Sequence, residues 1–560
     1  MLYDRMWISI AVCLIATLGC GSEKKDDAQS DAGDDAGTDT DTGDYVDPSS
    51  FCEELGLPAR DFDGGGDGSA ALYALATDFT VPTTKGAWSL SARWSGCDSY
   101  LWIQDRPHQN SSAFGYGIWE READVAELFE RLPLNSELFF VSYETEPDAI
   151  ETALAGIEQL VDAAFAEMDD ETRQWWERRV HYVTETATEL PGWLGEIMQS
   201  PGWGVGIDRF QRVRYIGSYA DPARYDDGAG WFGPNISMAA NEAIYYNHEA
   251  EREAALDPAA EVVTLWDGEL SSGTVHAEAQ LPHAVEMADF DRLELDLALR
   301  CDGEGEFGTC PEWDYLVHLY LCDQQDPDLC ELELGRWITT YHREGRWVHD
   351  ISGLLPLLAD GGERRFAFQT EQPYELTLEL RLSSTGQEVR PSETILLWHE
   401  APTFDEAYNE SFEPVILSVP ADAARVELAT LVTGHGMSSP GNCAEFCNTD
   451  HHFYVNGNDN VRDFPQAGSL FGCQDQVSEG TVPNQYGTWW YGRGGWCPGK
   501  HVPLVTIDVT DQVVPGEESL FEYEGYYQGM IYSGGDSWRH IDVTAWLVIS
   551  RLEMPRGGDG

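Results

Sequence analysis

Two acidic residues stand in short segments whose cysteines restrict the backbone. Glu445 lies at the centre of Cys443-Ala-Glu-Phe-Cys447, and a disulfide between these cysteines would close a very small loop. Asp314 follows Trp313 at the start of a predicted strand, where alternation sends the two side chains to opposite faces. Clustered carboxylates whose pKa values are pushed apart can supply a general base and a general acid. We therefore predict that Asp314 and Glu445 take part in chemistry.

The cysteines of this region also allow a different interpretation. Cys443 and Cys447 are close in sequence to His451 and His452, and both residue types bind zinc. The ten cysteines that follow residue 20, out of 12 in the chain, form an even set. An even set in an exported protein is the pattern of structural disulfides. We therefore expect disulfides here and no metal.

The charge of the chain excludes one class of partner. There are 99 acidic residues against 33 basic ones, a formal net charge of −66. Charge of this sign repels the phosphates of DNA and RNA. We expect no nucleic-acid partner.

The start of the chain predicts export. Residues 6–18 form an apolar stretch after Arg5 that is short for a membrane span, as in a signal peptide. Leu18-Gly19-Cys20 resembles the end of a bacterial lipoprotein signal, which implies lipidation of Cys20 and a place in the cell envelope, most simply the outer membrane. Secretion after ordinary cleavage, or a membrane-anchored start, is the alternative. Residues 21–50 are acidic and almost free of apolar side chains, so we expect a disordered linker.

An α/β domain is predicted for residues 51–221. Strand and helix patterns alternate at 100–104, 122–132, 137–143, 147–168 and 171–179. The segments DFTVPTTKGAWSLSARWSGCDSYLWI and GVGIDRFQRVRYIG resemble the opening and closing elements of thioredoxin-like proteins. However, no Cys-x-x-Cys follows the first long strand, where a reactive thiol would stand. We therefore predict a structural disulfide between Cys52 and Cys97 and no redox activity.

The second half of the chain predicts two β-sandwiches. Alternating strands and turns follow a connector at 222–261, and WVHDISGLLPLLADGGERRFAFQTE is echoed by VTIDVTDQVVPGEESLFEYEG. This internal repeat favours two similar domains side by side. We place them at 262–402 and 403–552, followed by a tail at 553–560.

Three segments of this half resemble the peptide-N-glycosidase F family. They are Cys301-x8-Cys310-Pro-Glu-Trp313-Asp314, Gly441-Asn-Cys443-Ala-Glu445-Phe-Cys447 and Tyr491-Gly-Arg493-Gly-Gly-Trp496-Cys497. Gly335-Arg-Trp-Ile-Thr and Thr433-Gly-His435-Gly stand in matching order between them, so the resemblance spans about residues 262–552. It implies two adjacent jelly rolls, hydrolysis of the amide that joins a glycan to Asn, an N-glycosylated protein or peptide as partner, and no cofactor. We expect a monomer.

The resemblance also implies roles for single residues. Asp314 falls on the primary catalytic aspartate and would orient the attacking water. Glu445 would bind the reacting sugar-amide and assist proton transfer, and Glu371, in Gln-Thr-Glu, would contact a sugar hydroxyl. The residues that would bind substrate are Trp313, Arg493, His435 and Trp496. The implied disulfides are Cys301–Cys310, Cys443–Cys447 and Cys473–Cys497. Cys322 and Cys330 have no counterpart in the family, and we expect them to form an additional link across a hairpin.

Two departures from the family leave other functions open. Pro373 and His435 stand where the family has tryptophans of the substrate cleft. A non-catalytic glycan-binding surface protein on the same fold is therefore the alternative. A copper monooxygenase shares this double sandwich, but its His and Met ligands would have to come from His435, Met437, His451 and His452.

The lipid anchor is tested by Cys20→Ser. We expect this variant to leave the membrane fraction, because the residue that would carry the lipid is gone, while the unaltered protein sediments with membranes. Fractionation followed by immunoblotting measures it. A Cys20→Ser protein that still sediments with membranes would contradict lipid anchoring.

Overall fold

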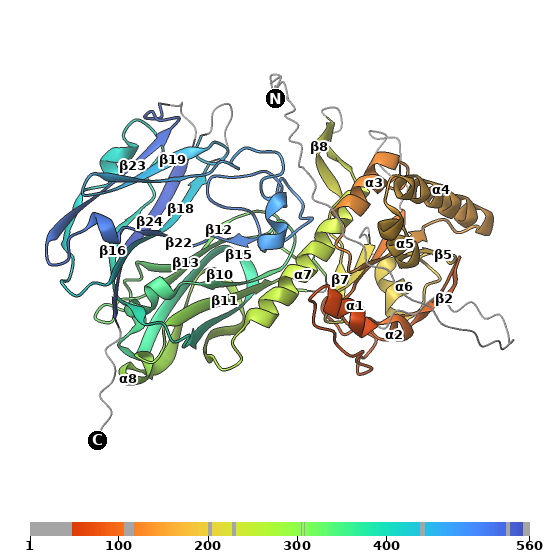
Figure 1. Cartoon of the computed structure of the whole chain (residues 1–560), viewed down its shortest axis with the longest axis horizontal. Helices are drawn as coiled ribbons and strands as arrows, with labels where there is room; N and C mark the ends of the chain where they lie inside the picture. Colours follow the sequence, from red (N-terminus) through yellow and green to blue (C-terminus); the bar gives the residue numbers. More distant parts are fainter. Residues whose placement is uncertain are drawn as a thin grey trace, which may run out of the picture. The chain divides into compact units, whose positions relative to one another are not determined.

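The computed structural model (Figure 1) describes most of the chain after residue 47. The described residues are 48–105, 117–199, 204–226, 231–303, 305–306, 308–436, 443–533 and 538–552. Pro48–Gly560 form one compact unit. The predicted signal peptide, Cys20, Met437 and the tail at 553–560 lie outside the described residues, as does the linker up to residue 47. Within the described ranges, no helix is long and apolar enough to cross a membrane.

The N-terminal domain is built on a seven-stranded sheet with helices on both faces. Its strands, in the spatial order β2-β1-β5-β4-β3-β6-β7, are β1 (Thr80–Thr83), β2 (Gly86–Ser89), β3 (Ser99–Asp105), β4 (Ser136–Ser142), β5 (Val180–Val183), β6 (Gly204–Ile207) and β7 (Val213–Tyr215). Its helices are α1 (Pro48–Glu54), α2 (Leu90–Arg93), α3 (Glu122–Arg131), α4 (Pro147–Ala166), α5 (Asp170–Arg179) and α6 (Gly192–Met198). Strands β3, β4 and β5 are parallel, and β6 and β7 are antiparallel to their neighbours. This is the expected α/β domain; its thioredoxin-like character stays a prediction. Helix α1 begins at Pro48, inside the segment predicted as linker.

Alternation along β3 explains the two-sided burial of this sheet. Leu101 and Ile103 pack in the core cluster that contains α3 and α4, whereas Tyr100 and Trp102 pack in the cluster that contains α6. Both faces are covered, as parallel strands require. Helix α4 begins with Pro147 at its first position, and its apolar residues recur at three- and four-residue spacing, which forms one buried stripe.

The predicted connector is itself ordered. It contains the end of β8 (Ala220–Asp226), then β9 (Trp231–Pro234), η1 (Ile236–Ala239) and α7 (Ala240–Ala255). Helix α7 carries two buried acidic residues. One pairs with an arginine of the N-terminal half of the chain and the other with an arginine of the C-terminal half. Glu249 pairs with Arg214 of β7, and Glu242 Oε1 lies 2.7 Å from Arg343 Nη1 of the β-rich half. Buried charges of this kind are tolerated only in pairs.

The first β-sandwich is organised by one very long strand. The elements of this sandwich are β10 (Glu261–His283), α8 (Ala284–Met287), β11 (Arg292–Arg300), β12 (Leu316–Leu321), β13 (Leu332–Ile338), β14 (Gly345–Asp350), η2 (Ser352–Leu358), β15 (Gly361–Ser383) and, from later in the chain, β21 (Lys500–His501). The first part of β15 pairs with β12 and its last part with β11, while β10 follows its other edge. The change of partner falls at residues 371–373, opposite a register shift in β10 between Ser271 and Gly273. A bulge of this kind bends a strand and redirects its side chains.

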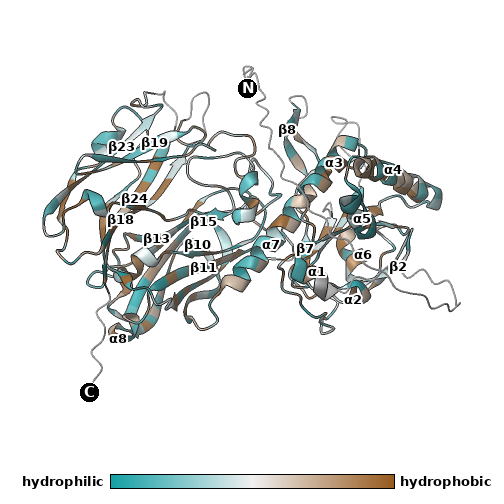
Figure 2. Cartoon of the chain, in the orientation of Figure 1, coloured by the Kyte–Doolittle hydropathy of each residue, from teal (hydrophilic) through white to brown (hydrophobic). Residues whose placement is uncertain are grey.

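The second sandwich consists of two four-stranded sheets. These have the orders β16-β24-β18-β22 and β17-β23-β19-β20. The elements are β16 (Val389–Glu400), η3 (Tyr408–Ser411), β17 (Val415–Ser418), β18 (Arg425–His435), β19 (Thr449–Val455), β20 (Asn458–Asp463), η4 (Gln474–Glu479), β22 (Val505–Asp508), η5 (Thr510–Gln512), β23 (Glu518–Tyr527) and β24 (His540–Leu552). Apolar residues concentrate along β24 in Figure 2, whereas α5 is largely polar. The mostly β architecture with two sandwiches is confirmed.

Five disulfides link the cysteines in the predicted pairs. They are Cys52–Cys97, Cys301–Cys310, Cys322–Cys330, Cys443–Cys447 and Cys473–Cys497. Zinc binding by Cys443 and Cys447, the competing interpretation, is therefore not the state seen here.

A buried arginine connects the two sandwiches. Arg336 of β13 donates to both oxygens of Glu333 at 2.8 and 2.7 Å, and also to Thr433 of β18 at 2.7 Å and Thr544 of β24 at 3.0 Å. Burial disfavours the charged Glu333, but the Arg336 guanidinium and His318 outweigh it, so the pKa of Glu333 lies well below its ordinary value. Each hydrogen bond that Arg336 donates is thus accepted by a buried oxygen atom.

Replacing this arginine tests its structural role. Arg336→Met leaves the Glu333 carboxylate buried beside an apolar chain, so we expect a loss of about 3–5 kcal/mol of stability. Arg551→Met is the matched control. Arg551 pairs with Glu393 and Asp422 at the surface, where such pairs contribute about 0–1 kcal/mol. Thermal unfolding measures both, and equal shifts would contradict the role given to Arg336.

Candidate active site

One buried guanidinium holds both predicted catalytic acids. Arg493 Nη2 lies 3.3 Å from Asp314 Oδ2, and its Nε lies 3.2 Å from Glu445 Oε1. Asp314 belongs to the first sandwich and Glu445 to the second, so the site forms where the two meet. Arg493 also donates to the backbone oxygens of Thr488 and Tyr491, at 3.3 and 2.8 Å, which fixes its orientation.

Asp314 is positioned by the loop that leads into β12. The Thr339 hydroxyl, at the end of β13, donates to Trp313 O and accepts from Tyr315 N, both at 2.8 Å. The residue between them, Asp314, is therefore held from both sides. The nearby Cys301–Cys310 disulfide ties down the start of the same loop.

Glu445 is positioned by its small disulfide loop and by two glycines. Gly436 N donates to Glu445 Oε2 at 3.1 Å, and Gly494 N donates to the Glu445 backbone oxygen at 2.6 Å. At Gly434, a Cβ atom would lie 1.9 Å from Ala444 O, so any side chain there would push the loop away. The Thr433-Gly-His-Gly segment thus fixes where the disulfide loop, and with it Glu445, lies.

Burial and neighbouring charges shift the pKa values of both acids. Burial raises the pKa of Glu445 to about 7; Arg493 opposes this shift and the neighbouring Asp314 carboxylate adds to it. Burial also raises the pKa of Asp314, whereas the Arg493 guanidinium and a hydrogen bond from Tyr341 oppose this shift. Near neutral pH, Glu445 can carry a proton and donate it while Asp314 accepts one.

Glu371 and Trp313 lie at the exposed edge of this cluster. Glu371 is exposed and stands at the bulge of β15, one residue beyond Thr370, which pairs with Val317 of β12. That register brings it to the end of β12 from which Asp314 projects. Within the described ranges, however, no hydrogen bond or ion pair joins Glu371 to Asp314, Glu445 or Arg493. Trp313 is 49% exposed and presents its ring to solvent.

His435 and Trp496 lie below this surface. Trp496 Nε1 donates to Gly434 O at 2.7 Å, and its ring packs on the Arg493 guanidinium, 4.8 Å from the ring centre. His435 is buried between Trp496 and His540, with ring centres 5.1 Å from each. Both residues thus pack against the groups that hold the acids. The sequence predicted instead that both contact substrate. Their role in substrate binding stays a prediction.

The site contains residues that sequence reasoning did not select. Tyr341 hydrogen-bonds Asp314, and Thr488 receives a hydrogen bond from Arg493 at 3.3 Å. Trp538 is 68% exposed and packs edge-on against His540, with ring centres 4.8 Å apart. Tyr341 follows the Gly335-Arg-Trp-Ile-Thr segment by two residues, which was a usable signal. Nothing local pointed to Trp538.

The loop that carries Arg493 is held by helix α7. Asn484, between Cys473 and Cys497, donates to Glu242 Oε1 and to Met238 O, both at 2.9 Å, and accepts from Asn241 at 3.1 Å. The segment before the sandwiches thus contacts the loop of the site directly.

The histidines considered as copper ligands have other partners. His451 is hydrogen-bonded to Thr449 at 2.9 Å and to Tyr523 at 2.7 Å. His452 lies 2.9 Å from Asp459 at the surface. Neither turns toward His435, so the set proposed for a copper monooxygenase does not assemble among the described residues.

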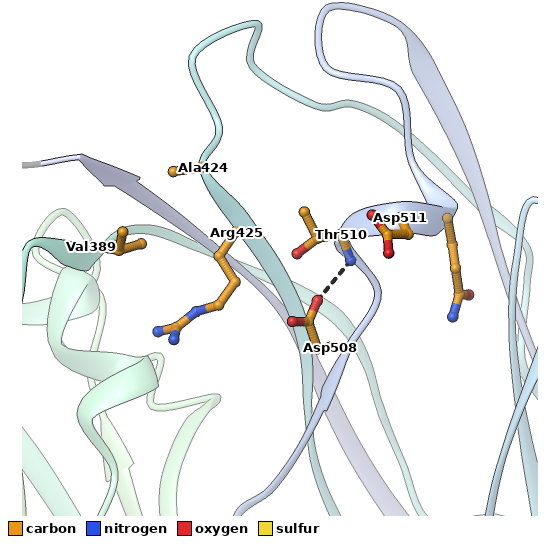
Figure 3. Close-up of a pocket in the computed structure, with 7 residues that line it drawn as sticks. Val389, Ala424, Arg425, Asp508, Thr510 and Asp511 are labelled. Carbon is orange, nitrogen blue, oxygen red and sulfur yellow. Dashed lines mark hydrogen bonds between the residues drawn. The ribbon is translucent and has the colours of Figure 1, made fainter.

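A separate pocket lies at the far end of the second sandwich. Figure 3 shows Arg425, Asp508 and Thr510 among its lining residues, with Thr510 N donating to Asp508 at 2.9 Å. Arg425 and His435 are the first and last residues of β18, about 33 Å apart at strand spacing. The pocket is therefore not part of the acidic site.

Comparisons with known proteins agree with this geometry. Residues 403–548 match a family model described as "Peptide-N-glycosidase F, C terminal". Peptide-N(4)-(N-acetyl-beta-D-glucosaminyl)asparagine amidase F of Elizabethkingia miricola is 24% identical over 271 residues, 44% of this chain and 71% of the relative. The resemblance to peptide-N-glycosidase F is confirmed.

Two solved structures are similar to part of this chain. The structure of PNGase F from Flavobacterium meningosepticum matches with a TM-score of 0.43 and 16% identity, covering 53% of this chain and 97% of that one. PNGF-II matches with a TM-score of 0.40 and 13% identity, covering 55% and 68% of the two chains.

The raised pKa of Glu445 predicts a pH dependence of stability. Between pH 4.5 and 7 the folded protein keeps a proton on Glu445 that the unfolded chain has lost, so stability falls as pH rises through this window. Glu445→Gln lacks this titration. We expect the unfolding free energy of the wild type, relative to Glu445→Gln, to fall by about 3 kcal/mol across the window.

Denaturant titrations at a series of pH values measure this difference. Glu312→Gln, which removes an exposed carboxylate near the site, is the control and should follow the wild type at every pH. A wild-type curve parallel to that of Glu445→Gln would show that Glu445 titrates normally.

Proposed function

We propose that this chain is an exported amidase that acts on the bond between an Asn side chain and an N-linked glycan. The substrate is a glycoprotein or glycopeptide, and the products are Asp and a glycosylamine. The observation that carries this proposal is the meeting of Asp314 and Glu445 on one buried guanidinium. The amidase named among the relatives supports the choice of bond.

The chemistry assigns different roles to the two acids. Water attacks the amide carbonyl carbon while Asp314, oriented by Arg493, accepts its proton. The carbon–nitrogen bond then breaks as Glu445 donates a proton to the departing nitrogen, which suits an acid whose pKa lies near 7. Glu371 and Trp313 are free to contact the sugar from the exposed side, and an aromatic ring offers an apolar face for a sugar.

A glycan-binding protein without catalysis is the second candidate. It rests on the two places where tryptophans of the family's substrate cleft are replaced, so that the use of this cleft can differ from that of the amidases. Pro373 stands in the bulge of β15, and His435 is buried beneath the site, so neither provides an aromatic face for a sugar.

We also propose that the protein works outside the cytoplasm. Five disulfides suit an oxidising compartment. Anchoring through Cys20, a thioredoxin-like fold for the α/β domain without redox activity, and a monomeric state complete the proposal.

Asp314→Asn tests the mechanism. The amide has nearly the same shape but cannot take the proton of water, so we expect turnover to fall by about 10²–10⁴-fold. The assay incubates a glycopeptide with the protein and follows conversion of Asn to Asp and release of the intact glycan by mass spectrometry. Glu312→Gln is the matched control and should retain full activity.

The assay also separates the two candidate functions. Wild-type turnover by Asp314→Asn would refute the role of this residue. No conversion by the wild type, together with saturable glycan binding, would favour the binding protein.

A further inference from the structure

Three metal-ligating side chains meet where β18 ends and β24 begins. The two strands are antiparallel, with His435 opposite His540 and Thr433 opposite Asp542. His540 and Asp542 are two residues apart on β24 and therefore share a face. One ligand atom from each of His435, His540 and Asp542 lies within 4.8 Å of the others.

Two polar atoms of this cluster are left without partners. His435 and Asp542 are 7% and 8% exposed, yet His435 Nε2 and Asp542 Oδ1 have no hydrogen-bond partner among the described residues. Asp542 Oδ1 is 3.2 Å from His540 Nε2, a distance without hydrogen-bond geometry. An unpartnered polar atom in the interior costs about 1–3 kcal/mol. A group that engages both atoms would remove this cost.

We propose that His435, His540 and Asp542 bind one divalent transition-metal ion of the Zn²⁺ class. Two imidazoles and a carboxylate, with a fourth position left for water, form a ligand set common in zinc proteins. In a tetrahedral site with metal–ligand distances of about 2.0–2.2 Å, ligand atoms are about 3.3–3.5 Å apart. The His540–Asp542 distance of 3.2 Å is close to this value, and the ligand atom of His435 lies within 4.8 Å of the other two.

The surrounding charges permit a cation. Arg336 donates to the Asp542 backbone oxygen, but its charge is balanced by the bidentate pair with Glu333. Asp542 supplies a carboxylate that faces His540, 3.2 Å away. His318 bonds Glu333 and His399 bonds Thr544, so neither competes for the ion.

The ion would lie next to the acidic site. Gly436, directly after His435, donates the N–H that Glu445 Oε2 accepts. Fixing His435 to a metal would therefore fix this donor as well. The sequence prediction of no metal rested on the even set of cysteines, and His435 was weighed only as a copper ligand with Met437, His451 and His452. His540 and Asp542 stand more than a hundred residues after His435.

Zn²⁺ binding by the full-length protein tests the proposal. After treatment with a chelator, calorimetric titration with Zn²⁺ should show a site that His540→Ala and Asp542→Asn each weaken by about tenfold or more. His452→Ala, which removes a histidine from the surface pair with Asp459, is the matched control and should bind like the wild type. Zn²⁺ should also raise the thermal midpoint of the wild type.

A second measurement needs no variant. Co²⁺ in place of Zn²⁺ should give the visible absorption of a four-coordinate ion. Its absence, or Zn²⁺ binding that is unchanged in both site variants, would overturn the proposal. Binding is measured without substrate, so its failure is separate from any failure of amide hydrolysis.

Discussion

The charge on Arg493 must be neutralised in a place that water hardly reaches, and two acids from different sandwiches do this together. A buried guanidinium without carboxylates would be strongly destabilising. The same rule applies at the other junctions of the molecule. Arg336 joins the sandwiches through Glu333, Thr433 and Thr544, and Arg343 joins the β-rich half to α7 through Glu242. The domains therefore meet through buried arginines, each of which contacts at least one partner in another domain that lies far away in sequence.

Local patterns in the sequence predicted the parts of the structure that depend on neighbours in the chain. Strand alternation and the internal repeat indicated the sandwiches, and the spacing of cysteines gave the loop that holds Glu445. Features that depend on strand register could not be predicted from the sequence. His435 meets His540 only because β18 and β24 pair, and Glu371 is redirected by a bulge that exists only opposite β10. The ion pairs of α7 could not be predicted because the arginines that bury its acids are remote in sequence.

The two acids also show why such a site is costly to keep. Burial raises the pKa of Glu445 to about 7, and the Asp314 carboxylate beside it adds to this shift. The protein holds this arrangement with the five-residue Cys443–Cys447 disulfide loop, with the Thr339 hydroxyl that bonds the backbone on both sides of Asp314, and with glycines that admit no side chain. Sites that carry unfavourable electrostatics are commonly supported in this way by a rigid surrounding.

Through the contact of Asn484 with α7, the N-terminal half of the chain supports the acidic site, although it contributes none of the catalytic side chains. The loop from Cys473 to Cys497 carries Arg493 at one end and rests at its middle on Asn241 and Glu242. A substitution in α7 can thus be felt at Asp314 and Glu445 without touching either acid. Cutting the chain between the helix and the sandwiches would keep every catalytic side chain and still remove the support of the loop that brings them together.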